Sequence, residues 1–157
     1  VIILSLFACS RNFELSRIKI GSQIGGKGHI TNDSVTFVFH YTGKNSYRDL
    51  CNFIYFEGDT LCFSADFTGD LSGTVNAVFA DPLSSSVYPA ERVEIIRSRA
   101  YGFSLVGSLL EHFNRANLDA PIPAERVIHL PFVVRIEGQS GDKTAHGEKR
   151  GECIIKF

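Results

Sequence analysis

The residues best suited to bind a metal ion lie close together near the end of the chain. Asp142, His146 and Glu148 belong to a polar, glycine-rich stretch that runs from Gly138 to Gly151. Carboxylate oxygens and imidazole nitrogens are common ligands of divalent metals. Their spacing matches no zinc motif of the HExxH kind, and the alternative is that they are solvated side chains of a mobile loop. A metal site here requires a further histidine from elsewhere in the chain.

Two other short patterns resemble cofactor sites but lack an essential residue. Residues 21–28 nearly spell a phosphate-binding loop, but Gly28 stands where that loop needs a hydroxyl to hold Mg²⁺. Residues 66–73 offer oxygen atoms at alternate positions, as a calcium loop does. Leu71 and Ala77 occupy the places where such a loop needs glycine and a bidentate glutamate. We therefore expect no cofactor, and the chain shows no assembled catalytic motif.

A short apolar run opens the sequence and ends in a cysteine. Val1–Ala8 is too short to cross a bilayer, which takes about 20 apolar residues, but it suits the hydrophobic part of a secretory signal. The order Leu6-Phe7-Ala8-Cys9 resembles the lipobox of bacterial lipoproteins. The resemblance implies that residues 1–8 end a signal peptide and that Cys9 is acylated. Ser10 after it implies the outer membrane.

Two alternatives to the lipoprotein interpretation stay open. The apolar run could be an export signal without lipidation, or it could be a first core strand with Cys9 as a buried thiol. If the resemblance holds, the protein lies in the bacterial cell envelope and the lipid on Cys9 attaches it to a membrane. Its partner could then be another envelope protein.

Composition is typical of one folded domain, which we expect over residues 9–157. The 157 residues are 44% hydrophobic and 21% charged, so the chain can bury a core and is not expected to be disordered. The formal net charge is −1, and the chain therefore lacks the positive excess that nucleic-acid binding uses to neutralise phosphates. We expect no nucleic-acid partner.

The three later cysteines are Cys51, Cys62 and Cys153, an odd number, so at least one stays unpaired within the chain. Leu50–Phe56 and Leu61–Phe67 look like the two arms of a β-hairpin. In that hairpin the first two cysteines stand about four residues apart at ~3.4 Å each, beyond the roughly 7 Å reach of a disulfide. We expect both thiols to be reduced unless Cys153 reaches one of them.

Alternation of apolar and polar residues predicts an all-β, mainly antiparallel domain. The clearest strand covers residues 34–41, where Phe37 and Phe39 alternate with polar or smaller neighbours. A change of parity between Leu15 and Ile18 predicts a β-bulge in the first strand. The remaining strands are expected at 12–20, 50–56, 61–67, 74–80, 92–97, 127–137 and 152–157. Such a series of short strands favours an immunoglobulin-like β-sandwich.

One short helix interrupts this pattern. Tyr101, Leu105, Leu109 and Phe113 fall at helical spacing. Because Gly102 disfavours a helix at the start of this pattern, we expect the helix over residues 104–116. A strand through 101–106 followed by a shorter helix is the alternative.

Pro131 lies within the predicted strand 127–137 and cannot donate to a ladder. That strand is therefore expected at a sheet edge or with a bulge.

The leading functional hypothesis is a lipid-anchored, exported β-sandwich that binds or builds structure in the cell envelope and is not an enzyme. Its contacts are expected in three loops: 21–32, 83–89 and 138–151. One alternative is a carrier that holds a small apolar ligand under Leu105–Phe113. The other is a metal-dependent protein that uses Asp142, His146 and Glu148.

Overall fold

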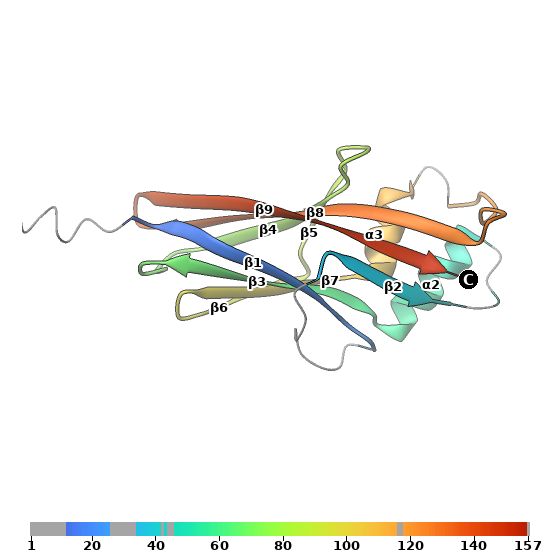
Figure 1. Cartoon of the computed structure of the whole chain (residues 1–157), viewed down its shortest axis with the longest axis horizontal. Coiled ribbons are helices and arrows are strands. Elements are labelled where there is room, and N and C mark those ends of the chain that lie inside the picture. Colours follow the sequence, from blue (N-terminus) through green and yellow to red (C-terminus); the bar gives the residue numbers. More distant parts are fainter. Residues whose placement is uncertain (1–11, 26–33, 42, 44–45, 116–117, 157) are drawn as a thin grey trace, which may run out of the picture.

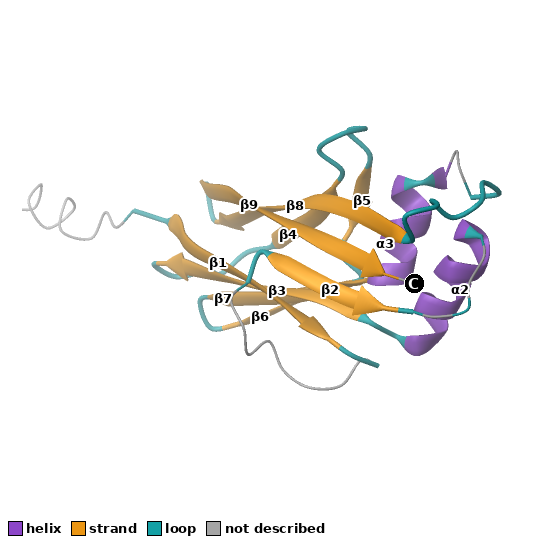
Figure 2. Cartoon of the chain, turned by 45° about the vertical axis from the view of Figure 1, so that its right-hand side comes forward, coloured by secondary structure: helices purple, strands orange, loops and turns teal. Residues whose placement is uncertain are grey.

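Two β-sheets pack face to face and two helices cover one end of the sandwich (Figures 1 and 2). The computed structural model describes residues 12–25, 34–41, 43, 46–115 and 118–156. Sheet I has the strand order β1-β3-β7-β6, and sheet II has the order β2-β9-β8-β4-β5. The all-β sandwich that the alternation predicts is confirmed for this part of the chain.

The elements have the following bounds: β1 Glu14–Gln23, β2 Thr36–His40, α2 Tyr47–Glu57, β3 Thr60–Thr68, β4 Val75–Ala80, β5 Val87–Pro89, β6 Arg92–Ile96, β7 Arg99–Leu105, α3 Val106–Phe113, β8 Val127–Ser140 and β9 Lys143–Lys156.

Sheet I is antiparallel throughout its described pairs. The register of β1 on β3 shifts between Leu15 and Arg17, which confirms the predicted bulge. Ile20, Leu61 and Phe63 point inward and have no exposed surface. The small inward residues of β7 allow this packing, since a Cβ at Gly102 would lie 2.4 Å from the Phe63 ring.

Sheet II is mixed, because β2 runs parallel to β9 while the other pairs are antiparallel. β2 confirms the clearest predicted strand, with Phe37 and Phe39 buried and Val38 about half exposed. The Ser-rich stretch expected as a loop at 83–89 ends in the three-residue strand β5.

The prediction of a loop over 138–151 is wrong. These residues form the second half of β8, the two-residue turn Gly141-Asp142 and most of β9. Gly141 lies in the turn, with φ +64°, whereas the other glycines of this stretch, Gly138, Gly147 and Gly151, mark close packing. A Cβ on Gly138 would lie 2.5 Å from the Phe67 ring, and one on Gly151 would lie 2.5 Å from the Phe132 ring. The polar residues between them point to solvent, so the stretch looked like a loop.

Pro131 lies in a part of β8 that is paired on one side only, although β8 as a whole is not an edge strand. β8 pairs with β9 along its whole length, but its pairing with β4 begins only at Val133. Among the described strands, the first part of β8, including Pro131, therefore has a neighbour on one side only. A missing backbone N–H costs nothing on the unpaired side of a strand.

The predicted strand 50–56 is also wrong, because residues 47–57 form the helix α2. Ser46 caps its first turn, with its Oγ accepting a hydrogen bond from the Asp49 N–H at 3.2 Å. Gly58 ends the helix in a left-handed conformation at φ +74°, where its N–H bonds back to the Ile54 carbonyl. The buried side of α2 presents Leu50 and Ile54.

The helix expected over 104–116 is shorter, and the alternative that begins with a strand is confirmed. β7 runs to Leu105 and α3 follows at once. α3 lies tightly against α2, since a Cβ at Gly107 would fall 2.6 Å from the Tyr55 backbone nitrogen and 2.8 Å from the Cys51 carbonyl oxygen. Within the described part of the chain, no helix combines the length and apolarity needed to cross a membrane.

A buried carboxylate joins the helical end to both sheets. Asp59 is 4% exposed and accepts hydrogen bonds from the Tyr41 hydroxyl and from the Gly25 N–H, the latter at 2.9 Å. Its backbone carbonyl accepts a bond from Val106 N at 2.8 Å, at the start of α3. Burial and the neighbouring Asp59 carboxylate raise the pKa of Tyr41. Residue 59 therefore ties together the ends of β1 and β2 and the start of α3.

Candidate functional site

The predicted metal ligands lie on the β8–β9 hairpin and not on a loop. Asp142 is in its turn, whereas His146 and Glu148 lie on β9, with their side chains on the outer face of sheet II. At roughly 3.4 Å per residue, Asp142 is about 14 Å along the strand from His146. Among the described residues, no three His, Cys, Asp or Glu side chains gather where they could hold a metal ion.

His146 and Glu148 have other neighbours on this face. His146 stands opposite Glu137, and Glu148 stands opposite Arg135. The Arg135 Nε lies 3.3 Å from the Glu148 Oε2, and both side chains are about half exposed. The four residues line a depression of about 430 Å³. The geometry therefore pairs Glu148 with a guanidinium instead of a second metal ligand.

The space under α3 is filled with side chains. Val106, Leu109 and Leu110 have no exposed surface, and Phe113 is 9% exposed. Together with the close approach of α3 to α2 at Gly107, this packing leaves the predicted apolar carrier pocket without support.

The proposed lipidation site, Cys9, lies outside the described residues. The other three cysteines are buried and free, as expected. The reason given for this expectation, that Cys51 and Cys62 lie on the two arms of one hairpin, is wrong. Cys51 is on a helix and not on a hairpin arm. Burial raises the pKa of Cys51 to about 12 and raises that of Cys153 as well.

The outer face of sheet I combines aromatic rings, charged side chains and a thiol. We use the name β3–β7 face for the outward-pointing side chains of three of its four strands, β3, β7 and β6. Two cross-strand rows define it: Cys62–Phe103–Arg92 and Ser64–Tyr101–Glu94, with a third row Asp66–Arg99–Ile96 at one end. β1 continues these rows with Gly21, Lys19 and Arg17. Aromatic rings thus lie in the middle of the face and charges flank them.

A hollow of about 360 Å³ opens on this face, within the size range of small-ligand sites. Its lining comprises Gln23, Cys62, Arg92, Glu94, Tyr101, Gly102 and Phe103. Next to this lining, Cys62 faces Gly21 on β1, a residue without a side chain.

The thiol in this hollow is not an activated nucleophile. Cys62 is 2% exposed, and its sulfur lies 3.4 Å from the Thr60 hydroxyl. Burial raises the pKa of the Cys62 thiol, and the Thr60 contact offsets this in part. A thiol must ionise to attack an electrophile. At neutral pH, Cys62 therefore lines the hollow as a small, uncharged side chain.

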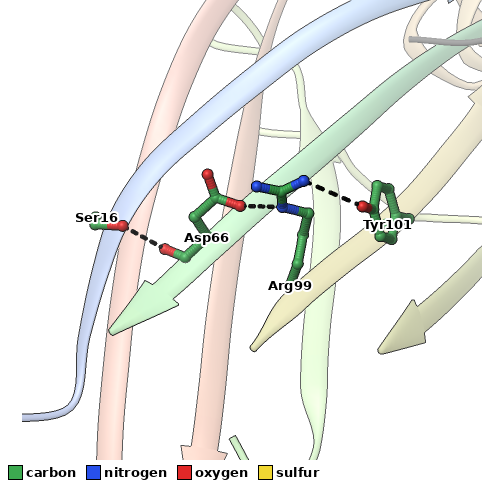
Figure 3. A network of polar contacts seen from close by, with 4 residues as sticks. All are labelled: Ser16, Asp66, Arg99 and Tyr101. Atoms are coloured by element: carbon green, nitrogen blue, oxygen red, sulfur yellow. Dashed lines mark hydrogen bonds and ion pairs between the residues drawn. The ribbon is translucent and has the colours of Figure 1, made fainter. Parts of the chain in front are cut away.

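A polar network fixes the charged end of the face, as Figure 3 shows. Arg99 donates through its Nε to the Asp66 carboxylate and through its Nη1 to the Tyr101 hydroxyl, the latter at 3.4 Å. The backbone carbonyl of Asp66 accepts a bond from Ser16 Oγ at 3.0 Å. The bonds to Tyr101 and Asp66 raise the pKa of Arg99, which stays charged. Tyr101 also borders a second hollow beside Ile96 and Arg97, so it contributes to the lining of both hollows.

Sequence reasoning missed this face because Tyr101 looked like part of a helical pattern. A signal was nevertheless present. Arg99, Tyr101 and Phe103 alternate with the small residues Ala100, Gly102 and Ser104. Large polar or aromatic residues that alternate with small ones fit a strand whose bulky side chains point outward.

No protein-family model matches this sequence, and no curated protein is significantly similar to it. The β3–β7 face is therefore the feature from which a function can be argued.

Proposed function

We propose that this chain is a lipid-anchored, exported β-sandwich that works by binding in the bacterial cell envelope, with the β3–β7 face as its contact surface. The observation that carries the proposal is the pair of hollows that share Tyr101 in their lining. Tyr101 and Phe103 supply aromatic area, and Arg92 and Arg99 supply charge. Tyr, Phe and Arg are the residue types enriched in protein interfaces, so a protein segment is the kind of partner that this face fits.

The fixed position of Arg99 strengthens this assignment. An arginine that is already oriented by Asp66 and Tyr101 loses less rotamer freedom when it meets a partner. The face also lies on the rigid strands of a sheet and not on a loop. Both features lower the entropic cost of binding, as expected of a recognition surface.

The strand order supports the immunoglobulin-like form of the sandwich. That fold, lettered in chain order, has an A-B-E-D sheet that faces a G-F-C sheet, with C′ added in variable-type domains. With β2 set aside as an additional strand, β1-β3-β7-β6 corresponds to A-B-E-D and β9-β8-β4-β5 to G-F-C-C′. Many cell-surface domains share this architecture, which fits an exported binding protein. The helix α2, inserted between β2 and β3, is an addition to that pattern.

The envelope location rests on the lipobox-like order Leu6-Phe7-Ala8-Cys9. A single acyl chain gives only marginal membrane binding, so stable attachment would need the multiple chains of the lipoprotein class.

One experiment tests location and contact surface separately. The complete gene is expressed in a bacterial host as wild type and as Cys9→Ala, and intact mass and detergent partitioning are measured. The proposal expects loss of the segment before Cys9 and added acyl mass, both abolished by Cys9→Ala. An unmodified product that retains Val1–Ala8 would refute the anchor.

The contact surface is tested in the same cells with a photo-crosslinking residue at Ile96, which is 57% exposed. The Tyr101→Ala/Phe103→Ala double variant should lose the crosslinked species. Val38→Ala/Ile154→Ala, on the outer face of sheet II, serves as the matched control and should keep it. Equal crosslinking in all three proteins would refute the β3–β7 face, whatever the result for Cys9.

A further inference from the structure

β6 is an edge strand of sheet I with unusually exposed apolar residues. Among the described strands it pairs with β7 on one side only. Val93 packs against the core, and Ile95, which shares its inward orientation, is nevertheless 36% exposed. Ile96 on the outer face is 57% exposed. An open edge with apolar side chains is a template for pairing with another strand.

The other edges carry devices against strand pairing that are absent from β6. On β1 the bulge at Leu15 disturbs the register, and Lys149 donates from its Nζ to the Ile18 carbonyl at 3.1 Å. β5 is three residues long and ends in Pro89. β2 is joined to β1 at its start, where Ser34 N donates to the Ile20 carbonyl. Bulges, charged side chains (lysine above all), proline and short length are devices that prevent edge pairing. β6, Arg-Val-Glu-Ile-Ile, contains no lysine or proline, and its two charges, Arg92 and Glu94, are of opposite sign and can therefore complement those of a second β6.

We propose that β6 pairs with β6 of a second copy of this chain, antiparallel and centred on Val93. In this register Val93 faces Val93 of the second copy, and Arg92 faces Glu94 in both directions. Two unlike cross-strand charge pairs then form on the outer face. Within one chain the Arg92 Nη2 already lies 2.5 Å from the Glu94 Oε1, so the dimer gathers four alternating charges on one surface.

The charges select this register over its neighbours. Directly opposed residues of an antiparallel pair point to the same face of the sheet. The two-fold axis must therefore lie where a residue opposes its own copy, since only then do core-facing residues oppose core-facing residues and outward residues oppose outward residues. An axis through Arg92 would oppose Arg92 to itself, and an axis through Glu94 would oppose Glu94 to itself. Directly opposed like charges destabilise a strand pair. An axis through Ile95 leaves Glu94 opposite Ile96 and forms no charge pair.

Pairing at β6 would join the two copies of sheet I into one continuous sheet. Because Arg92 and Glu94 also line the hollow around Phe103, the hollows of the two copies would lie side by side across the new strand pair. The dimer therefore goes beyond the proposed binding role by giving the β3–β7 face a second, symmetry-related half.

The test uses charge exchange on the full chain under reducing conditions. Dimerisation is measured by sedimentation for the wild type, Arg92→Glu and Glu94→Arg. The wild type should dimerise with rising concentration. Each single variant opposes like charges at both pairs, and its dissociation constant should rise at least about tenfold.

An equimolar mixture of the two variants should recover a dimer of wild-type affinity. In the mixed dimer one chain carries carboxylates at both positions 92 and 94, and the other chain carries guanidiniums at both. Every cross-strand pair at these positions then joins unlike charges again, although neither chain has the native sequence.

A charge reversal outside β6 serves as the matched control. Asp119→Arg breaks the exposed pair with Arg48, whose Nε lies 3.1 Å from the Asp119 Oδ1, and should leave dimerisation unchanged. Circular dichroism verifies that every variant is folded. A wild type that stays monomeric at millimolar concentration would overturn the proposal. So would a folded mixture that recovers no dimer, or single variants that dimerise as the wild type does.

Discussion

Removal of one hydroxyl should measurably weaken the joint at Asp59. In Tyr41→Phe the ring is kept, together with its stacking on Phe39 at 6.4 Å and its edge contact with Phe53 at 5.9 Å between centroids. Only the hydrogen bond from the Tyr41 hydroxyl to the Asp59 carboxylate is lost. Gly25 N–H remains as a donor to the other carboxylate oxygen. The substitution therefore isolates one bond to a buried charge.

The expected cost follows from burial. Tyr41 is 5% exposed and Asp59 is 4% exposed, so water cannot readily replace the lost donor. Hydrogen bonds to charged groups contribute about 1.5–3 kcal/mol net, and an unsatisfied buried acceptor adds to the loss. We expect the free energy of unfolding to fall by about 2–3 kcal/mol. For a domain of this size, that lowers the melting temperature by about 5–10 °C.

Urea denaturation followed by circular dichroism measures this difference. Tyr88→Phe is the matched control, because the Tyr88 hydroxyl bonds the exposed Glu91 carboxylate at 2.7 Å. It should cost under about 1 kcal/mol. The double variant Tyr41→Phe/Asp59→Asn should cost clearly less than the sum of its two single changes, since both remove the same bond. A Tyr41→Phe loss no larger than that of Tyr88→Phe would show that this bond does not hold the joint.

Two further predictions concern packing and the thiols. Gly107→Ala should lower the free energy of unfolding by about 2 kcal/mol or more, because the added Cβ meets the Tyr55 backbone. Gly147→Ala should cost less, because its Cβ meets the end of the flexible Leu15 side chain. Thermal melts measure both variants, and a lower melting temperature for Gly147→Ala than for Gly107→Ala would refute this reasoning. The pKa of Cys51, raised by burial to about 12, favours the protonated thiol in the folded state. Stability should therefore be intact below about pH 8.5 and fall as pH rises toward 12. In urea titrations at alkaline pH, Cys51→Ala should reduce the fall of the free energy of unfolding with pH. An unchanged fall would contradict the contribution of Cys51.

Strands with strict alternation of apolar and polar residues were predictable, because each side chain in such a strand faces either the core or the solvent. In β2 the odd-numbered residues Phe37 and Phe39 face the core and their neighbours face solvent. The bulge near Leu15 was readable for the same reason, since an extra residue changes parity. The order in which such strands pair is not contained in any local pattern.

Local reasoning failed at α2 because the same apolar residues suit a strand or a helix. The run around Ile54 is rich in aromatic residues, which favour strands. The signals that decide for the helix lie outside the run, at Ser46 and Gly58, and their capping bonds are present in the structure. Burial of Leu50 and Ile54 against the core then stabilises the helical choice.

The sequence by itself determined the all-β class, most strand positions, the short helix near the end of β7 and the lipobox-like start. Only the tertiary structure decided that Gly138 and Gly151 lie in long strands, because the rings that fill their places, Phe67 and Phe132, come from other strands or other parts of the hairpin. It likewise assembled Cys62, Arg99 and Tyr101 into one face through strand register. Register depends on contacts between distant segments, and no short stretch of sequence contains both partners.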